Sequence, residues 1–145
     1  MKTREFNSTD MAEVIDLYIE VFSKPPWNEK WEKQWVEDRI QWITSMPNSQ
    51  SIVGEKENKI IGAAFGFGKP YKGKLEFEII ELFVSTESQN QGNGKNLIQA
   101  LEKKLKKYGY SKTTILTARE SGPEKFYKRL NFSRLERLVF MQHWI

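Results

Sequence analysis

The spacing of apolar positions at the start of the chain predicts one strand followed by two helices. Between residues 11 and 22, apolar side chains recur every three or four positions, as on the buried face of an amphipathic helix. Pro25 and Pro26 end this helix. A second helix is predicted to begin near Asn28 and to end before residues 46–48. A short strand over residues 2–6 precedes both helices.

The middle of the chain has the spacing of consecutive strands. Residues 50–55 and 60–67 are rich in β-branched and apolar side chains and flank a predicted tight turn at Glu57-Asn58. A second break, at residues 69–74, leads into a third strand over residues 75–84. These segments predict three consecutive strands.

The last third of the chain alternates between helices and strands. A helix with an apolar stripe follows Gly94 and ends near Gly109, a residue that favours a helix C-terminus. A strand is predicted over residues 113–117, and Ser121-Gly122-Pro123 begins a last helix. From Phe132 onward we expect two short strands. The order β-α-α-β-β-β-α-β-α-β-β predicts an α/β domain (α+β mixed sheet) with helices on both faces.

Composition narrows the classes of protein to which the chain can belong. The 145 residues suit a single domain over positions 1–145, and the absence of cysteine excludes a disulfide framework and a cysteine nucleophile. The first residues do not form the apolar run of a signal peptide, and no stretch approaches the length of a membrane span. We therefore expect a cytoplasmic protein without a membrane partner.

The net charge of +4 fits an anionic cofactor but does not identify one. Most lysines of residues 103–107 fall opposite the apolar stripe of the predicted helix, which is typical of a solvated face. A nucleic-acid-binding domain built on these lysines has no sequence motif to support it, so we expect no nucleic-acid partner. His143 is the only histidine, and we expect no metal site.

The most informative motif is the run Gln89-Asn90-Gln91-Gly92-Asn93-Gly94-Lys95, which lies between an apolar strand and an amphipathic helix. Two glycines at such a turn let the backbone approach a ligand closely, and the free N–H groups of the helix N-terminus favour an anion. A dinucleotide fingerprint would need a third glycine. A Walker A loop would need Ser or Thr after Lys95, where this chain has Asn96.

Strand, Gln-x-x-Gly-x-Gly and helix together resemble the acetyl-CoA-binding motif of the GNAT acetyltransferase superfamily. The segment Glu124–Phe132 also looks like the Phe-Tyr-x-x-x-Gly-Phe helix of that superfamily, with Asn131 at its usual glycine. The resemblance covers nearly the whole chain. It implies a GNAT-type N-acetyltransferase that uses acetyl-CoA as co-substrate and no metal.

The resemblance also implies roles for residues around the cofactor. Main-chain amides of Gln89, Asn90, Gln91, Gly92, Asn93, Gly94 and Lys95 would hold the pyrophosphate. Backbone groups of Leu82, Phe83 and Val84 would pair with the pantetheine arm, with Phe83 and Val84 at a bulge of the fourth strand. Glu120 occupies a position where many members carry a cofactor-binding asparagine, so its effect on the cofactor stays open.

Tyr127 matches the tyrosine that is often assigned as general acid in this superfamily. Attack of an amine on a thioester forms a tetrahedral oxyanion and then expels a thiolate, which needs a proton. A thiol has a pKa of about 8.5 and a tyrosine of about 10, so a nearby tyrosine can supply that proton. The chemistry agrees with the implied role.

Two glutamates are candidates for the general base, with a chain of waters as the alternative. Glu78 stands eleven residues before Gln89, the spacing of the base glutamate in the histone-acetylating branch of the superfamily. Glu81 lies on the same predicted strand and is also a candidate for binding the acceptor amine. Simple alternation points the two side chains to opposite faces, and a β-bulge would reverse this parity.

The acceptor region of the superfamily corresponds to the first two predicted helices and the loop between them. Trp27 lies in that loop after two prolines, and we expect it to contact the acceptor. Trp31 and Trp35 are expected to pack into the helix core. The acceptor is a primary amine of an unidentified small molecule or protein.

A non-catalytic module that binds acyl-CoA is the alternative function for this chain. Tyr127 and the strand carboxylates argue against it. A homodimer formed through the predicted strands at Val139–Ile145 is a further expectation.

Overall fold

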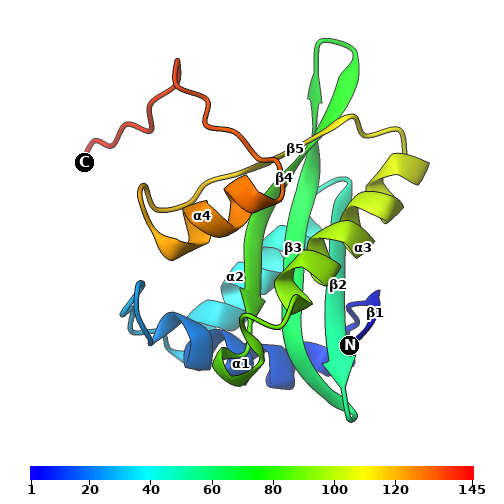
Figure 1. Cartoon of the computed structure of the whole chain (residues 1–145), viewed down its shortest axis with the longest axis vertical. Helices are drawn as coiled ribbons and strands as arrows, with labels where there is room; N and C mark the ends of the chain where they lie inside the picture. The colour runs from blue at the N-terminus through cyan, green and yellow to red at the C-terminus, as the bar shows by residue number, and fades with distance from the viewer.

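The computed structural model describes all residues from 1 to 145 and contains one five-stranded mixed sheet (Figure 1). The strands lie side by side in sequence order. The first four are antiparallel to their neighbours, and the fifth runs parallel to the fourth. They are β1 (Lys2–Glu5), β2 (Ser49–Lys56), β3 (Lys59–Tyr71), β4 (Lys74–Val84) and β5 (Lys112–Ile115).

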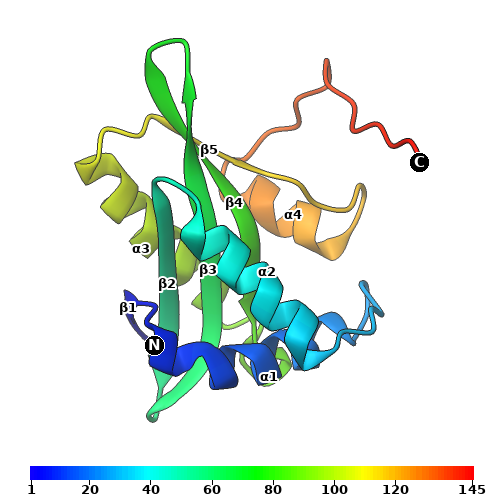
Figure 2. The same ribbon diagram turned by 180° about the vertical axis from the view of Figure 1, so that it is seen from behind.

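Two helices cover each face of the sheet, as Figures 1 and 2 show from opposite sides. The first pair, α1 (Met11–Phe22) and α2 (Lys33–Ser45), lies on one face. The other face carries α3 (Asn93–Lys107) and α4 (Gly122–Arg129). Two short 3-10 helices, η1 (Ser8–Asp10) and η2 (Thr86–Ser88), precede α1 and α3. No helix is long and apolar enough to cross a membrane.

The sheet separates two hydrophobic cores. Neighbouring strand residues alternate between them because successive side chains of a strand point to opposite faces. Ala63 and Phe65 pack with α1 and α2, whereas Ala64 packs with Leu97 and Leu101 of α3. The mixed α/β fold expected from the sequence is therefore confirmed.

Local signals explain several element boundaries. Glu57 and Asn58 both adopt positive φ angles in the tight turn between β2 and β3, as expected for a two-residue hairpin loop. Ser121 caps α4, because its hydroxyl accepts a hydrogen bond from the Glu124 N–H. Gly109 follows the end of α3 with a φ of 79°. These turns and caps follow the sequence prediction.

The second helix begins later than predicted. Asn28 has a φ of 50°, whereas a helix N-cap residue needs an extended backbone. The N–H groups of Trp27 and Asn28 both donate to the Lys24 carbonyl and close a turn after α1. The helix starts at Lys33 instead.

The two strands predicted after Phe132 are absent. Residues 133–145 contain no helix or strand, and their only backbone hydrogen bond joins the Leu138 N–H to the Leu135 carbonyl. Apolar spacing favours a strand, but a strand forms only where an edge accepts its backbone groups. This segment lies beside no such edge, so the prediction is wrong for the chain in this conformation.

Candidate active site

The centre of the candidate site is the part of β4 that has lost one of its two neighbours. β3 pairs with β4 from Lys74 to Val84, but β5 pairs only with Glu76–Ile79. Beyond Ile79, the backbone groups on the outer edge of β4 have no strand partner. An extended ligand can pair with such an edge in the manner of an added strand. Leu82 and Phe83, predicted to bind the cofactor arm, lie on it.

A β-bulge at Ile80 lies at the same point. Phe65 of β3 pairs with Glu81 and Gly66 pairs with Ile79, which leaves Ile80 as the extra residue of β4. The expectation of a bulge at Phe83 and Val84 is wrong, because the ladder from β3 is regular there. Gly66 allows the tight crossing at the bulge, since a Cβ on it would lie 2.2 Å from the Glu78 carbonyl oxygen.

The bulge brings Glu78 and Glu81 to the same face of the sheet. Glu78 is paired with Phe67 and Glu81 with Phe65, and both phenylalanines belong to the core beneath α1 and α2. Directly paired residues share a face of the sheet. Simple alternation would have placed the two glutamates on opposite faces of the sheet. The extra residue Ile80 reverses the alternation and places both on one face, a choice that the sequence left open.

Glu81 is a buried carboxylate, only 5% exposed. Its Oε1 accepts a hydrogen bond of 2.5 Å from Nε of Arg39 on α2 and a longer one, 3.4 Å, from the Tyr18 hydroxyl on α1. Burial raises the pKa of Glu81, and the Arg39 guanidinium offsets part of that rise. Glu81 is therefore a stronger base than an exposed glutamate.

Glu78 occupies a more solvated position than Glu81. Its Oε2 lies 2.5 Å from Lys69 Nζ on β3, and both side chains are partly exposed. Water therefore reaches the Glu78 carboxylate, whereas the Glu81 carboxylate is buried. The geometry therefore favours Glu81 over Glu78 for acid–base chemistry on this face.

Tyr127 lies on α4 with its ring packed between Phe126 and Phe132, whose ring centroids are 5.1 and 5.5 Å from that of Tyr127. Burial raises the pKa of Tyr127, and the negative charge of Glu81 raises it further. The hydroxyl therefore stays protonated throughout the neutral and mildly basic range. Although the two residues are 46 positions apart in the sequence, the Glu81 charge therefore acts on the pKa of Tyr127 in the folded protein.

The loop before α3 is held by its own amide side chains. Gln89 Nε2 donates to the Val84 carbonyl, Gln91 Nε2 to the Glu87 carbonyl and Asn93 Nδ2 to the Ser88 carbonyl. Asn90 adopts a left-handed backbone with a φ of 58°. In all three bonds a side-chain amide donates to a backbone carbonyl, so the backbone N–H groups of the loop are not used in them.

The N-terminus of α3 leaves donors free for an anion. Gly92 is the N-cap residue with a φ of 81°, and the first helical bond is the one from the Asn96 N–H to its carbonyl. The N–H groups of Asn93, Gly94 and Lys95 therefore have no helical acceptor. The partial positive charge at this end of α3 and the exposed Lys95 side chain both favour a negative ligand.

The two sequence motifs meet where α4 packs on the start of α3. A Cβ on Gly94 would lie 3.0 Å from Cζ of Phe126, so only glycine lets the aromatic ring approach this closely. Phe126 precedes Tyr127 on α4. This contact links the predicted phosphate loop to the predicted general acid.

The tryptophans differ in their environment. Trp27 is partly buried against Phe22, with a ring separation of 5.8 Å. Trp31 packs edge-on against Tyr18 at 5.1 Å, as expected for a core residue. Trp35 is half exposed, so the expectation that it packs in the core is wrong. The buried stripe of α2 consists of Val36, Ile40 and Ile43 instead.

Arg39 and Tyr18 are site residues that the sequence reasoning missed. Arg39 directly precedes Ile40 of the buried stripe of α2, and its guanidinium lies 5.9 Å from the centre of the Trp31 ring. A charged residue at the border of an apolar helix stripe is a weak signal for a buried partner. Tyr18 is hidden in the regular apolar spacing of α1 and gives no such signal.

No group of three or more histidine, cysteine or acidic side chains is arranged to hold a metal ion. Glu120 has a φ of 58°, and its N–H donates to Glu124 Oε2 at 2.5 Å. This bond fixes the loop between β5 and α4.

A comparison with protein-family models identifies one family. The model of the acetyltransferase (GNAT) family matches residues 11–132. No curated protein matches the chain by sequence.

Solved structures with the same fold include acetyltransferases from three sources. A possible acetyltransferase from Clostridium difficile has a TM-score of 0.84 at 11% identity, covering 99% of this chain and 97% of that one. An aminoglycoside acetyltransferase from an uncultured soil metagenomic sample, solved with sisomicin, has a TM-score of 0.73 at 21% identity, covering 99% and 95%. A ribosomal-protein-alanine N-acetyltransferase from Brucella melitensis biovar Abortus has a TM-score of 0.79 at 12% identity, covering 99% and 100%.

The Arg39–Glu81 pair yields a stability prediction. Arg39→Gln leaves Glu81 buried without a cation, so we expect the free energy of unfolding at pH 7 to fall by about 1–3 kcal/mol. The substitution raises the pKa of Glu81 in the folded state further above its unfolded value. Stability that depends on a raised carboxyl pKa is present at low pH and is lost as the pH rises. The deficit of the variant should therefore shrink near pH 4.

Denaturant unfolding at pH 4 and pH 7 measures both effects. The double variant Arg39→Gln/Glu81→Gln is the matched control, because it removes the charge together with its partner and should recover most of the loss. A deficit that is the same at both pH values would contradict the assignment.

Proposed function

Because the chain belongs to the acetyltransferase (GNAT) family, we propose that it transfers an acetyl group from acetyl-CoA to a primary amine. The observation that carries this proposal is the buried Glu81 carboxylate, only 5% exposed, on the strand β4 whose outer edge has no partner beyond Ile79. Its negative charge raises the pKa of Tyr127 on α4, which supports a proton acceptor and a proton donor that serve one site. Amide formation from an ammonium and a thioester needs both.

Two features fit acetyl-CoA as the co-substrate. The free N–H groups of Asn93, Gly94 and Lys95 suit its pyrophosphate. The outer edge of β4, which includes Leu82 and Phe83, suits the amide groups of its pantetheine arm. The Val84 carbonyl accepts a hydrogen bond from Gln89, so Val84 contributes less to this edge than we expected from the sequence.

Glu81 is the proposed general base of the reaction. An amine is protonated near neutral pH and must lose a proton before it can attack. The buried Glu81 carboxylate has a raised pKa and therefore a greater affinity for that proton than an exposed glutamate. Arg39 and Tyr18 hold Glu81 in place through its Oε1, which leaves Oε2 for the acceptor or for a bridging water.

The free amine then attacks the carbonyl carbon of the thioester, and the new C–N bond turns the carbonyl oxygen into an oxyanion. A backbone N–H near the bulge of β4 can donate to this oxygen. The C–S bond breaks next, Tyr127 gives its proton to the leaving thiolate, and the second proton of the amine nitrogen passes to the Tyr127 oxygen as the amide forms. Tyr127 begins this step protonated at neutral pH, and burial raises its pKa further.

The acceptor is proposed to lie between the loop after α1 and the Glu81 side of the sheet. Trp27 and Trp31 offer aromatic surface there, and Trp31 Nε1 donates to Glu29 at 2.7 Å. The carboxylate of Glu29 has no cationic partner in the protein. Aromatic rings and a free carboxylate favour a cationic amine, from either a small molecule or a protein.

Binding of acetyl-CoA is the first prediction of this proposal. At about 100 times its Kd, acetyl-CoA should stabilise the protein by roughly 2.7 kcal/mol and raise Tm by several degrees. Lys95→Glu should weaken acetyl-CoA binding by about tenfold, because it places a negative charge beside the pyrophosphate. Titration calorimetry and thermal shift measure both effects.

Lys103→Glu is the matched control for that substitution, because Lys103 is exposed on the same helix two turns away. It should leave the Kd for acetyl-CoA within about twofold. Equal losses in the two variants would indicate only nonspecific attraction to the basic helix. No thermal shift at millimolar acetyl-CoA would rule out the cofactor site.

Catalysis is tested at Tyr127. Tyr127→Phe should lower turnover by roughly a hundredfold or more with the Kd for acetyl-CoA unchanged, because it removes only the donated proton. Release of free thiol is followed with a panel that contains a polyamine, an aminoglycoside, an amino-acid amide and a peptide with a free N-terminus. Tyr110→Phe is the matched control, because Tyr110 is a buried tyrosine that packs against Phe77, and it should leave turnover unchanged.

An unchanged rate in Tyr127→Phe would remove this residue from the mechanism. Binding of acetyl-CoA without thiol release from any amine would favour the non-catalytic acyl-CoA-binding module instead.

A further inference from the structure

The positive charge of the chain is concentrated in two segments. Residues 69–74 and residues 103–112 together contain eight lysines and no acidic residue. The whole chain has 23 basic and 19 acidic residues, so 15 basic residues stand against 19 acidic ones in the remainder. The net charge of +4 therefore consists of +8 in the two segments and −4 elsewhere. The eight residues are Lys69, Lys72, Lys74, Lys103, Lys104, Lys106, Lys107 and Lys112.

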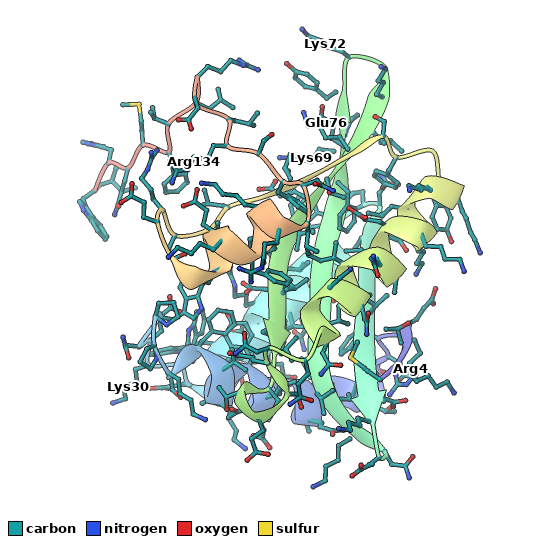
Figure 3. The ribbon with its side chains drawn as sticks, in the orientation of Figure 1. Arg4, Lys30, Lys69, Lys72, Glu76 and Arg134 are labelled. Carbon is teal, nitrogen blue, oxygen red and sulfur yellow. The ribbon has the colours of Figure 1, made fainter.

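The fold places the two segments at one end of the molecule. Residues 69–74 form the tip of the hairpin between β3 and β4, and residues 103–112 run from the last turns of α3 to the start of β5. The hairpin projects beyond the rest of the sheet in Figures 1 and 2, and Figure 3 labels Lys72 at its tip. A hollow of about 540 Å³ between the two segments is lined by Pro70, Gly73, Lys74, Leu75, Gly109 and Ser111.

Most of the charge at this end has no partner within the protein. Three of the eight lysines form ion pairs: Lys69 with Glu78, Lys104 with Glu5 and Lys112 with Glu76. A concentration of unpaired like charges creates a positive potential that attracts an anionic ligand. The lysines that are exposed and form no ion pair are Lys72, Lys74, Lys103, Lys106 and Lys107.

The proposed co-substrate does not account for this charge. Its pyrophosphate would lie at the N-terminus of α3, whereas Lys106 and Lys107 lie at the C-terminus of the same helix. A helix of 15 residues is roughly 22 Å long, and salt screens exposed charges beyond about 10 Å. The lysines at this end are therefore available to a different anion.

Exposed aromatic rings accompany the lysines. Tyr71 is 52% exposed on the hairpin, and Tyr108 is 58% exposed directly after Lys107. Lys72 Nζ lies 5.5 Å from the centre of the Tyr71 ring, so the hairpin presents a cation and an aromatic surface together. Proteins bind single-stranded nucleic acids with this combination, in which bases stack on aromatic rings and basic side chains follow the phosphates. An acidic protein would use the lysines but offers no bases to the rings.

We propose that the hairpin tip at residues 69–74 and the end of α3 at residues 103–108 bind a single-stranded nucleic acid, with the lysines on its phosphates and Tyr71 stacked on a base. The proposal departs from the expectation of no nucleic-acid partner, which was based on residues 103–107 alone. The fold adds the hairpin lysines and Tyr71 to those residues. The proposal does not depend on acetyl transfer, so it can hold or fail independently of the proposed function.

Fluorescence anisotropy with labelled RNA and DNA single strands of about 20 nucleotides is the first test. Binding is expected in the micromolar range at about 0.1 M salt, with a slope of log K against log salt near −3.5 if all five unpaired lysines contact phosphates. A duplex of the same sequence and a polyglutamate of similar charge should bind at least about tenfold more weakly. No binding of either single strand would overturn the proposal, and equal binding of the duplex or the polyglutamate would do so as well.

Variants of the hairpin then locate the binding surface. Lys72→Glu/Lys74→Glu should weaken binding of the single strand by at least about tenfold and reduce the salt slope by about 1.4. Lys56→Glu/Lys59→Glu is the matched control, because it makes the same change of charge on the hairpin between β2 and β3, at the other end of β3. The control should stay within about threefold of the unaltered chain. Equal losses in the two double variants would show attraction to net charge alone and would overturn the proposal.

Stacking is tested at Tyr71. Tyr71→Ala should weaken binding of the single strand by about tenfold, whereas Tyr71→Trp should preserve it because a base can stack on either ring. All the substituted side chains are exposed, and thermal unfolding checks that each variant remains folded. Unchanged binding in Tyr71→Ala would overturn the assignment of this surface to a nucleic acid.

Discussion

The site depends on the early loss of the pairing between β4 and β5. Two parallel strands that stayed together would satisfy each other along their whole length and leave nothing for a ligand. Here the pairing stops at Ile79, and the extra residue Ile80 bends β4 at the next position. The same short stretch frees a backbone edge and turns Glu81 to the face on which α1 and α2 pack. The edge proposed to bind the cofactor and the proposed general base are thereby placed on one short stretch of β4.

Burial of the Glu81 carboxylate costs free energy of folding, which indicates that the residue serves a purpose other than stability. A carboxylate that is 5% exposed requires compensation, and Arg39 and Tyr18 provide it from two different helices. In proteins, replacing a buried ion pair with well-packed apolar side chains is often neutral or stabilising, so stability alone does not explain the pair. The polar arrangement is better explained by a carboxylate whose pKa is poised for proton transfer. Arg39 also limits this effect, because a nearby cation favours the ionised form of Glu81.

Periodicity and turn chemistry were sufficient to predict most of the fold. The apolar stripes of α1 and α3, the hairpin at Glu57-Asn58 and the cap at Ser121 are local signals, and each gave the correct element. The prediction of two C-terminal strands was wrong because a strand needs a neighbouring strand to pair with its backbone groups, and apolar spacing alone does not supply one. The predicted start of α2 at Asn28 was wrong because Asn28 takes part in the turn that follows α1. That turn gives it a left-handed backbone, which a helix N-cap does not have.

The candidate site was predicted only in part. The glycine-rich turn and Tyr127 belong to continuous motifs, so the sequence identified them directly. The choice between Glu78 and Glu81 needed the register of β3 against β4, because one inserted residue reverses which face a side chain occupies. Arg39 and Tyr18 needed the tertiary structure, since they approach Glu81 from separate helices and carry no motif of their own.

The central claim is that Glu81, and not Glu78, accepts the proton of the acceptor amine. It is tested most directly by the pH dependence of kcat/KM for acetyl transfer in Glu81→Gln and in Glu78→Gln. The account predicts that Glu81→Gln loses turnover by roughly a hundredfold and no longer shows the rise of rate with pH that titration of its raised pKa causes in the unaltered enzyme. Glu78→Gln should keep both the rate, within a few-fold, and the shape of the profile. A profile that is preserved in Glu81→Gln and lost in Glu78→Gln would contradict the account.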